Sequence, residues 1–398
     1  MNDEMTLRTN TRQVWCGDVA IGGGAPVSIQ SMTNTRTEDA EATAGQIVAL
    51  AEAGADIVRV AVPTIEAAKS FAEIKRIVKD SDRAVPIVAD IHFDYKIALE
   101  TIQAGADKIR INPGNIGGAE RIKAVADAAG AAGIPIRIGV NSGSLEEYLQ
   151  DLFKVEPAKA LAESALNNIE LLRNTGFDDI VVSVKSSDVV VNTEAHKILA
   201  SQTTYPLHIG ITEAGFGEAG IIKSAAGIGA MLAMGIGDTM RVSLTGNPVR
   251  EIPAAREILK AVNLLPGQIT MISCPTCGRC KVDLPSLSRE VSSVISEIEK
   301  QRVLEAKLIR METNLEKTEE KPERLKIAER PLTVALMGCA VNGPGEASHA
   351  DLGVACGVDG GIYFEKGVKI GPVKYDEIAQ KIIDGISLYT QLNQPEHC

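Results

Sequence analysis

Short apolar runs recur along the first two thirds of the chain, and most of them are followed by an Ala-rich helical stretch. Alternating strand-like and helical segments predict parallel strands that are joined by helical crossovers. Eight such units close into a (β/α)8 barrel, the TIM-barrel architecture, and an open doubly wound sheet is the structural alternative. The expected strands are Val27–Met32, Asp56–Val62, Pro86–Ile91, Lys108–Pro113, Pro135–Asn141, Asp179–Lys185, Pro206–Thr212 and Thr239–Thr245, and helices are expected at Ala42–Ala53, Ala67–Lys79 and Ile122–Ala132.

A short internal repeat supports this prediction. The segment Ala53–Val60 (AGADIVRV) is echoed by Ala104–Ile111 (AGADKIRI). In both segments we expect a helix to end at glycine and a strand to begin at aspartate. The repeat therefore indicates one strand–helix unit that is used twice.

The alternating pattern breaks near Gln268, so we expect residues 1–267 to form the barrel and residues 268–398 to form a smaller α/β domain. A charged stretch at 297–330 interrupts the second domain, and it predicts a solvated amphipathic helical hairpin, with a partner-binding helix as the alternative. The apolar residues of that stretch are Val303, Leu304, Leu308, Met311 and Leu315.

Composition narrows the class of protein. Hydrophobic residues make up 45% of the chain and aromatic residues only 3%, which is typical of cores built from small aliphatic side chains. The net charge of −11 argues against a nucleic-acid partner. Because the sequence shows no signal-peptide or membrane-spanning run, we expect a cytoplasmic protein. The cytoplasm is reducing, so the seven cysteines are poor candidates for disulfides. Cys16, Cys356 and Cys398 are expected to be apolar fillers.

The remaining cysteines have metal-ligand spacing. Cys274, Cys277 and Cys280 form two overlapping C-x-x-C steps, and Cys339 precedes a Gly-Pro-Gly-Glu segment that ends at Glu346. A zinc site and an iron–sulfur cluster are both compatible with such a turn. Three thiolates with one other ligand, which Glu346 can supply, favour a 4Fe–4S cluster over zinc. Cys280 is either a further ligand or a spare thiol.

Basic residues recur inside or directly after the barrel strands. A single arginine in a strand is usually a rim ion pair, but five cations outnumber the acidic residues of the same strands. Because a buried charge needs an opposite charge, we expect a multiply charged anion such as a diphosphate at the carboxyl ends of the strands. The five cations are Arg59, Arg110, Arg137, Lys185 and Arg241.

Other polar residues at the strand ends extend the candidate site. Glu213 ends the seventh strand and is either a proton donor or a structural carboxylate, whereas His92 and His208 are expected to serve packing or hydrogen bonding. The loop 112–115 can present backbone N–H groups to an anion. The other polar residues at these strand ends are Ser31, Asn34, Asp90, Asn141, Ser243 and Thr245.

Five segments together give the chain a specific resemblance. They are Gln30–Thr35, Asp90–Asp94, Ile111–Asn115, Cys274–Cys277 and Val341–Glu346, in that order. The chain resembles the bacterial 4-hydroxy-3-methylbut-2-en-1-yl diphosphate synthases of the non-mevalonate isoprenoid pathway from about Arg8 to near its C-terminus. The resemblance implies a two-electron reductive ring opening and dehydration of 2-C-methyl-D-erythritol 2,4-cyclodiphosphate to a linear allylic diphosphate. Flavodoxin or ferredoxin is the implied electron donor.

The resemblance also implies roles for individual residues. The 4Fe–4S ligands fall on Cys274, Cys277, Cys339 and Glu346, which leaves Cys280 as a non-ligand, and Glu213 falls where a carboxylate protonates the substrate. The implied assembly is a homodimer in which the cluster domain of one subunit caps the barrel of the other. The stretch between Cys277 and Cys339 is longer than in compact bacterial members. The implied diphosphate contacts are Arg59, Arg110, Arg137, Asn141, Lys185, Arg241 and Ser243.

Overall fold

The structure, a computed structural model, describes residues 10–313, 325, 328–339, 341 and 343–391. The chain divides between Leu264 and Leu265 into two compact units, which are considered one at a time. In the part of the chain that is described, no helix is long and apolar enough to cross a membrane.

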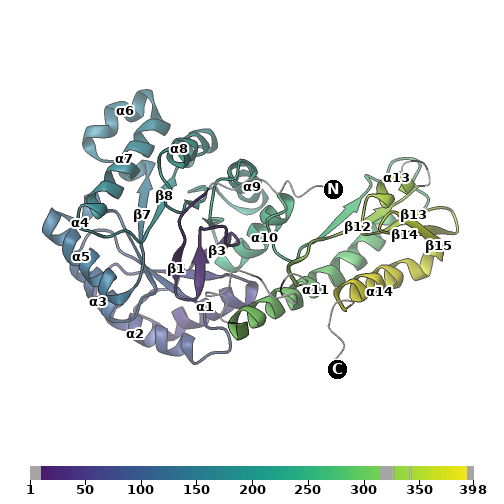
Figure 1. The fold of residues 1–398 in the computed structure, drawn as a ribbon, viewed down its shortest axis with the longest axis horizontal. Coiled ribbons are helices and arrows are strands. Elements are labelled where there is room, and N and C mark those ends of the chain that lie inside the picture. Colours follow the sequence, from purple (N-terminus) through teal and green to yellow (C-terminus); the bar gives the residue numbers. More distant parts are fainter. Residues whose placement is uncertain (1–9, 314–324, 326–327, 340, 342, 392–398) are drawn as a thin grey trace. The chain divides into compact units, whose positions relative to one another are not determined.

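The first unit is a parallel barrel surrounded by helices, and Figure 1 shows the strands at its centre. Its eight strands, counted over the described residues, pair in the order β8-β7-β6-β5-β4-β3-β10-β9, and a bridge from Val182 to Leu207 links the two ends of the sheet. The prediction of a (β/α)8 barrel is therefore confirmed. The strands are β3 (Ser28–Met32), β4 (Ile57–Ala61), β5 (Ile87–Asp90), β6 (Lys108–Ile111), β7 (Ile136–Asn141), β8 (Ile180–Lys185), β9 (His208–Ile209) and β10 (Thr239–Met240).

Some of the helices around the barrel, α1 and α2 among them, begin at side-chain caps that the sequence supplies. Asp39 accepts a hydrogen bond from the Ala42 N–H and Thr64 accepts one from the Ala67 N–H. These caps lie before the first apolar residues, so both helices begin two residues earlier than the apolar periodicity predicts. The helices are α1 (Ala40–Ala53), α2 (Ile65–Lys79), α3 (Tyr95–Gln103), α4 (Pro113–Ile116), α5 (Ala119–Ala132), α6 (Gln150–Val155), α7 (Pro157–Arg173), α8 (Val189–Gln202), α9 (Gly217–Ala233) and α10 (Glu251–Ala261).

The repeated Ala-Gly-Ala-Asp segment has a structural basis. Gly54 takes a left-handed φ of 107° after α1, which ends the helix at a position that favours glycine. The aspartate that follows each glycine fixes the neighbouring strand: Asp56 accepts from the Ile29 N–H at 2.9 Å, and Asp107 accepts from the Ile87 N–H at 2.6 Å. The same residue pattern therefore sets strand register at two places in the barrel.

A short hairpin closes the amino-terminal end of the barrel. Strands β1 (Val14–Cys16) and β2 (Val19–Ile21) pair antiparallel, and their apolar side chains pack against residues near the starts of β4, β5 and β8. Cys16 is fully buried there, and burial raises its pKa to about 11, as expected for an inert filler. Because the hairpin covers this end, the polar residues at the opposite strand ends face the open end of the barrel.

The second unit is a mixed sheet between helices. Its five strands, within the described ranges, lie in sequence order, with β11, β12 and β13 parallel and β14 and β15 antiparallel. Alternate residues of β12 face opposite sides: Val334 and Leu336 pack with α11 and α14, whereas Ala335 and Met337 pack with α13. The elements are β11 (Ile269–Ser273), α11 (Leu284–Thr313), β12 (Leu332–Met337), α13 (Gly343–Ser348), β13 (Leu352–Cys356), β14 (Gly360–Glu365), β15 (Val368–Lys374) and α14 (Ile378–Gln391).

The charged stretch 297–330 is only partly the solvated hairpin that the sequence predicts. Leu304 and Leu308 are indeed exposed, but α11 begins at Leu284 and buries two charged residues of the stretch, Glu299 and Arg302. Glu299 accepts a hydrogen bond from the Ile269 N–H at 2.6 Å, so α11 is tied to the first strand of the sheet. The expected hairpin turn, including Leu315, lies outside the described residues.

Candidate functional site

A cavity of about 130 Å³ opens at the carboxyl ends of the barrel strands. The seven residues that the resemblance implies as diphosphate contacts all line it, because they lie within or directly after parallel strands that surround one barrel interior. Asp90 is its one lining carboxylate among the described residues. The lining residues are Arg59, Asp90, His92, Arg110, Arg137, Gly139, Asn141, Ser183, Lys185, Thr212, Arg241 and Ser243.

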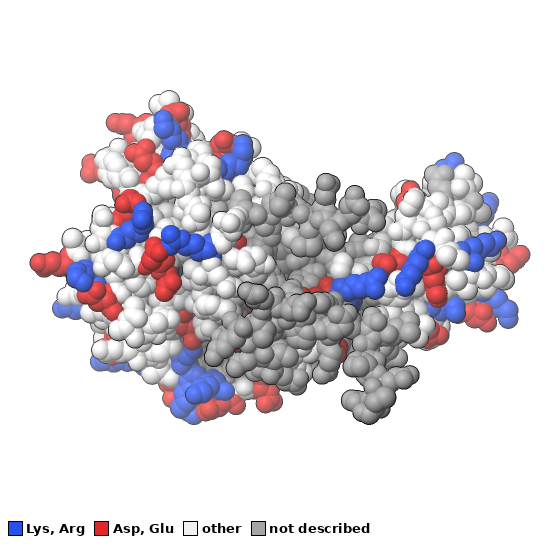
Figure 2. Space-filling view, viewed as in Figure 1, with Lys and Arg blue, Asp and Glu red and all other residues white. Residues whose placement is uncertain are grey.

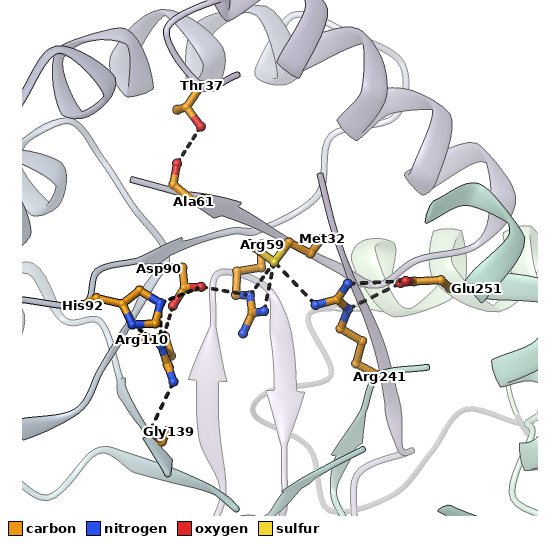
Figure 3. A network of polar contacts seen from close by, with 10 residues as sticks. All are labelled: Met32, Thr37, Arg59, Ala61, Asp90, His92, Arg110, Gly139, Arg241 and Glu251. Atoms are coloured by element: carbon orange, nitrogen blue, oxygen red, sulfur yellow. Dashed lines mark hydrogen bonds and ion pairs between the residues drawn. The ribbon is translucent and has the colours of Figure 1, made fainter. Parts of the chain in front are cut away.

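Asp90 holds two of the arginines in place. Its carboxylate lies 3.6 Å from Arg59 Nε and 3.1 Å from Arg110 Nη1, and all three side chains are largely buried. Burial acts to raise the pKa of Asp90, but Arg59, His92 and Arg110 outweigh it and hold that pKa well below its ordinary value. Asp90 therefore stays ionised and fixes both guanidinium groups (Figure 3).

Arg110 is packed into its position by its surroundings. Its Nη1 contacts His92 Nε2 at 3.0 Å, and its Nη2 donates to the Gly139 carbonyl at 3.1 Å. A Cβ at Gly139 would lie 2.2 Å from Arg110 Nε, so only glycine leaves room for this arginine. Asn141, with its amide oxygen turned toward the guanidinium, accepts from Nη2 at 3.2 Å. His92 thus hydrogen-bonds to an arginine of the site, in agreement with the expected packing or hydrogen-bonding role.

Arg241 has a carboxylate partner that the sequence analysis missed. Glu251, the first residue of α10, is 2% exposed and lies 3.3 Å from Arg241 Nη2. It also accepts from the Ser31 hydroxyl at 2.8 Å and the Leu244 N–H at 3.1 Å. Ser31 therefore helps to hold Glu251 in place beside Arg241. The sequence feature that could have identified Glu251 is its position at the start of a helix, shortly after the last barrel strand.

The positive charges of Arg137 and Lys185 are balanced by nearby carboxylates much less than those of Arg59, Arg110 and Arg241. Arg137 is 1% exposed, and its Nε and Nη1 atoms make no hydrogen bond to any described residue. Burial, followed by Arg59 and Arg110, lowers the pKa of Arg137, and burial followed by Arg137 lowers that of Lys185 well below its ordinary value. Since a guanidinium keeps its proton at neutral pH, the cost of burying Arg137 remains in the ligand-free protein.

Two further basic residues lie deeper in the barrel. Lys108, at the first position of β6, is fully buried, and its Nζ has no hydrogen-bond partner in the described ranges. Burial lowers the pKa of Lys108 to about 8. His208 is also fully buried, and burial together with Arg137 and Lys185 lowers its pKa well below its ordinary value, so it is neutral. The sequence analysis missed Lys108, although it stands two residues before Arg110 and so faces the same side of the strand.

The exterior of the barrel is organised differently from this interior. On the face drawn in Figure 2, residues of both signs are interspersed over the barrel helices. Charged residues on the barrel helices form local pairs along one helix, such as Arg76–Glu73 at 2.7 Å and Lys123–Asp127 at 2.8 Å. The acidic net charge of the chain therefore coexists with a positively charged cavity.

Two candidate features of the mouth do not belong to the cavity lining. Glu213 does not line the cavity: its side chain is exposed, next to Thr212, which does line it. Glu213 has a left-handed φ of 50°, a strained conformation for a residue other than glycine. The loop 112–115 does not offer the Gly114 N–H to an anion, because that N–H donates to Asn168 Oδ1 at 2.9 Å and to Asn112 Oδ1 at 3.2 Å.

In the second unit, two adjacent strand ends bring the cysteine segments together. Ser273 of β11 pairs with Leu336 of β12, so Cys274 and Cys339 both follow the carboxyl ends of neighbouring parallel strands. The Gly338 N–H points to Cys274 Sγ at 3.2 Å, and the Lys281 N–H donates to the Gly338 carbonyl at 3.0 Å. The turn that carries Cys274, Cys277 and Cys280 is thus attached to the loop that carries Cys339.

This donor set fits an anionic iron–sulfur group in its chemistry. A backbone N–H that points at a sulfur stabilises a thiolate, and Thr276, between two of the cysteines, has a left-handed φ of 44° that reveals a constrained turn. Cys277 and Glu346 are exposed. Among the described residues the side chains do not already converge as three His, Cys, Asp or Glu ligands of one metal ion.

Cys280 differs from the other cysteines of the turn. Its thiol donates to the Val282 carbonyl at 3.3 Å, and its sulfur packs against Gly338 and the core of the unit. Cys356 lies in that core as the sequence predicts, and burial raises its pKa to about 11. Cys398 is outside the described residues.

Comparison with known proteins covers nearly the whole chain. Residues 11–256 match the family described as the GcpE TIM-barrel domain, and residues 304–387 match the GcpE protein C-terminal domain. Three similar proteins, each named 4-hydroxy-3-methylbut-2-en-1-yl diphosphate synthase (flavodoxin), come from Caldicellulosiruptor saccharolyticus, Caldanaerobacter subterraneus and Bacillus subtilis. They are 47%, 48% and 46% identical, over 95%, 96% and 98% of this chain and 99%, 97% and 94% of their own lengths.

The buried charge of Arg137 generates a stability prediction. We expect Arg137→Met to raise the unfolding free energy of the ligand-free protein by about 1–4 kcal/mol, since an apolar side chain of similar size removes an uncompensated buried charge. The measurement is the thermal or denaturant midpoint. The matched control is Arg173→Met, because Arg173 is half exposed and pairs with Glu170 at 3.0 Å, and it should change stability by less than about 0.5 kcal/mol. A marked loss of stability in Arg137→Met would mean that Arg137 has an internal counter-charge.

Proposed function

We propose, because the chain belongs to the GcpE family of 4-hydroxy-3-methylbut-2-en-1-yl diphosphate synthases, that its barrel cavity binds 2-C-methyl-D-erythritol 2,4-cyclodiphosphate. The family consists of oxidoreductases of isoprenoid precursor synthesis. In the proposed reaction the ring is opened and the substrate is reductively dehydrated by two electrons. The product is the linear diphosphate (E)-4-hydroxy-3-methylbut-2-enyl diphosphate.

The surplus of positive charge in the cavity carries this proposal. Five cationic residues line it, whereas Asp90 is the one lining carboxylate in the described chain. A cyclic diphosphate supplies the missing negative charge, and Arg137 and Lys185 are the cations with most to gain from it. Ring opening converts one bridging phosphate oxygen into a terminal one with additional charge. Cations already held in place stabilise that developing charge, which makes the phosphate a better leaving group.

The second unit is proposed to hold a 4Fe–4S cluster through Cys274, Cys277, Cys339 and Glu346. Such a cluster supplies electrons one at a time and a Lewis-acidic iron. The attachment of the Cys274 turn to the Cys339 loop supports this ligand set. Glu346, exposed on α13, would provide a weaker and more readily displaced ligand than a thiolate. Cys280 is proposed to be a non-ligand because its thiol already donates to a carbonyl.

Glu213 is proposed to supply a proton at the mouth of the barrel. It directly follows Thr212, a cavity-lining residue, and its strained backbone conformation is typical of a position retained for function. Its exposed side chain would need to be covered for efficient proton transfer. A second protein surface at the mouth would provide that cover.

The exposed apolar residues around the mouth support a homodimer. Four large side chains on the loops and helix starts that follow β5, β7, β8 and β9 are between 65% and 77% exposed: Phe93, Tyr148, Val190 and Phe216. Exposed apolar groups that gather at one face of a protein mark an interaction surface. We propose that the cluster unit of a second copy covers this face, which would also exclude water from the reaction. Val341, 65% exposed near Cys339, would lie in that contact.

The electron donor is proposed to be a flavodoxin, which is the donor in the printed names of the relatives. Flavodoxins are acidic as a rule, and the chain itself is acidic, so docking requires a local basic surface. Arg279 and Lys281 are exposed beside the cysteine turn and can provide it.

The activity is tested by anaerobic turnover. The purified protein, with reduced flavodoxin and the cyclic diphosphate, should form the linear allylic diphosphate, detected by chromatography and mass spectrometry. The control omits flavodoxin. No consumption of the cyclic diphosphate by protein that contains a full complement of iron and sulfide would contradict the proposal.

The cysteine assignment predicts different behaviour for two neighbouring residues. Anaerobically prepared protein should contain about four irons and four sulfides per chain. Cys277→Ser should lose most of this iron because a ligand is removed, whereas Cys280→Ser should keep it. The readouts are iron and sulfide content and the visible absorption of the cluster. Loss of iron in Cys280→Ser with retention in Cys277→Ser would reverse the assignment.

The dimer proposal predicts an effect of charge at the mouth. Phe216→Asp should raise the dimer dissociation constant at least about tenfold, since a carboxylate would be buried in an apolar contact, and turnover should fall with it. Met234→Asp is the matched control, because Met234 is exposed at the opposite end of the same helix, α9. Sedimentation velocity measures both variants. Equal dissociation constants for the two would contradict the proposed contact.

A further inference from the structure

Met32 lies between two arginines of the cavity. It is the last residue of β3, and Figure 3 draws its sulfur between the two guanidinium groups. Arg59 approaches Sδ with Nε at 3.2 Å and Nη2 at 2.9 Å, and Arg241 approaches it with Nη1 at 3.4 Å. One thioether therefore contacts N–H donors from two different strands.

Each of these arginines is held on its other side by an acid. Asp90 lies 3.6 Å from Arg59 Nε, and Glu251 lies 3.3 Å from Arg241 Nη2. The polar contacts thus run in a chain from Asp90 through Arg59, Met32 and Arg241 to Glu251. Met32 is the one uncharged member of this chain, and it occupies the centre.

The charge of the central acceptor determines what the cavity can bind. The five cations that line the cavity exceed Asp90 and Glu251 by three positive charges, and a carboxylate at position 32 would lower that excess to two. An aliphatic side chain would leave the excess but would give the facing N–H groups no acceptor. A thioether is a weak, neutral acceptor, so it orients the two groups without neutralising them.

We propose that Met32 is a positioning residue for diphosphate binding: its sulfur aligns Arg59 and Arg241 and keeps their charge available to the ligand. The inference rests on the proposed function of the barrel cavity. It assigns a polar role to a methionine whose ordinary role in a barrel is packing.

Three substitutions at position 32 separate alignment from packing. Gln has nearly the length of Met and a neutral acceptor, Leu has similar bulk without an acceptor, and Glu has a charged acceptor. We expect Met32→Gln to bind the cyclic diphosphate within about threefold of the unsubstituted protein and Met32→Leu to bind roughly tenfold more weakly, the size of effect that follows from losing bonds to charged groups. Met32→Glu should bind more weakly than Met32→Leu.

The measurement is anaerobic calorimetry on the full-length holoenzyme, with the cyclic diphosphate and with inorganic diphosphate as probes. Met240→Leu is the matched control. Met240 is a buried methionine of β10 that precedes Arg241, and its sulfur accepts no hydrogen bond from a guanidinium group of the described residues. It should leave the affinity unchanged. Thermal midpoints verify that each variant is folded.

The outcomes separate failure of the proposed role of Met32 from failure of the proposed function of the cavity. If Met32→Leu binds as tightly as the unsubstituted protein while Met32→Gln binds weakly, Met32 only packs and the inference is overturned. Equal weakening in Met240→Leu and Met32→Leu would overturn it as well, because the effect would then come from general repacking. If the unsubstituted protein binds neither probe, the proposed function of the cavity fails instead.

Discussion

The central constraint in the barrel is that its buried cationic side chains outnumber the carboxylates beside them. Arg137 and Lys108 have buried donor atoms with no partner in the described chain, and Lys185 is surrounded by four arginines. A barrel tolerates this arrangement because its hydrogen-bonded strands and packed helices supply stability from elsewhere. The stored cost is recovered when an anion enters, so it contributes to affinity. Asp90 and Glu251 do not remove the surplus; each orients the arginines nearest to it.

The second unit complements the barrel in chemistry. Its cysteines follow two neighbouring parallel strand ends, which is the same device that gathers the cations in the barrel. The proposed reductive ring opening needs both units, since one has the charges proposed to bind a diphosphate and the other has the thiols proposed to hold a redox group. In the proposed dimer, the exposed apolar residues around the barrel mouth would bring the two sets of residues to one substrate.

Much of this was predictable from the sequence, and the failures have physical reasons. Strand periodicity located all eight barrel strands, and the seven expected anion contacts line one cavity because strand order fixes where strand ends converge. Glu251 and Lys108 were missed because their importance comes from three-dimensional neighbours. The local pattern predicts a solvated charged stretch, but Glu299 is buried and accepts a hydrogen bond from the backbone of Ile269, 30 residues away in sequence, which no local pattern encodes.

The most direct test is an anaerobic crystal structure of the holoenzyme with the cyclic diphosphate bound. The account predicts phosphate oxygens within hydrogen-bonding distance of Arg137 and Lys185, with Asp90 and Glu251 still paired to the arginines that they hold now. It would be contradicted by a diphosphate bound outside the barrel, or by Arg137 and Lys185 turned toward carboxylates of the protein while the ligand lies elsewhere.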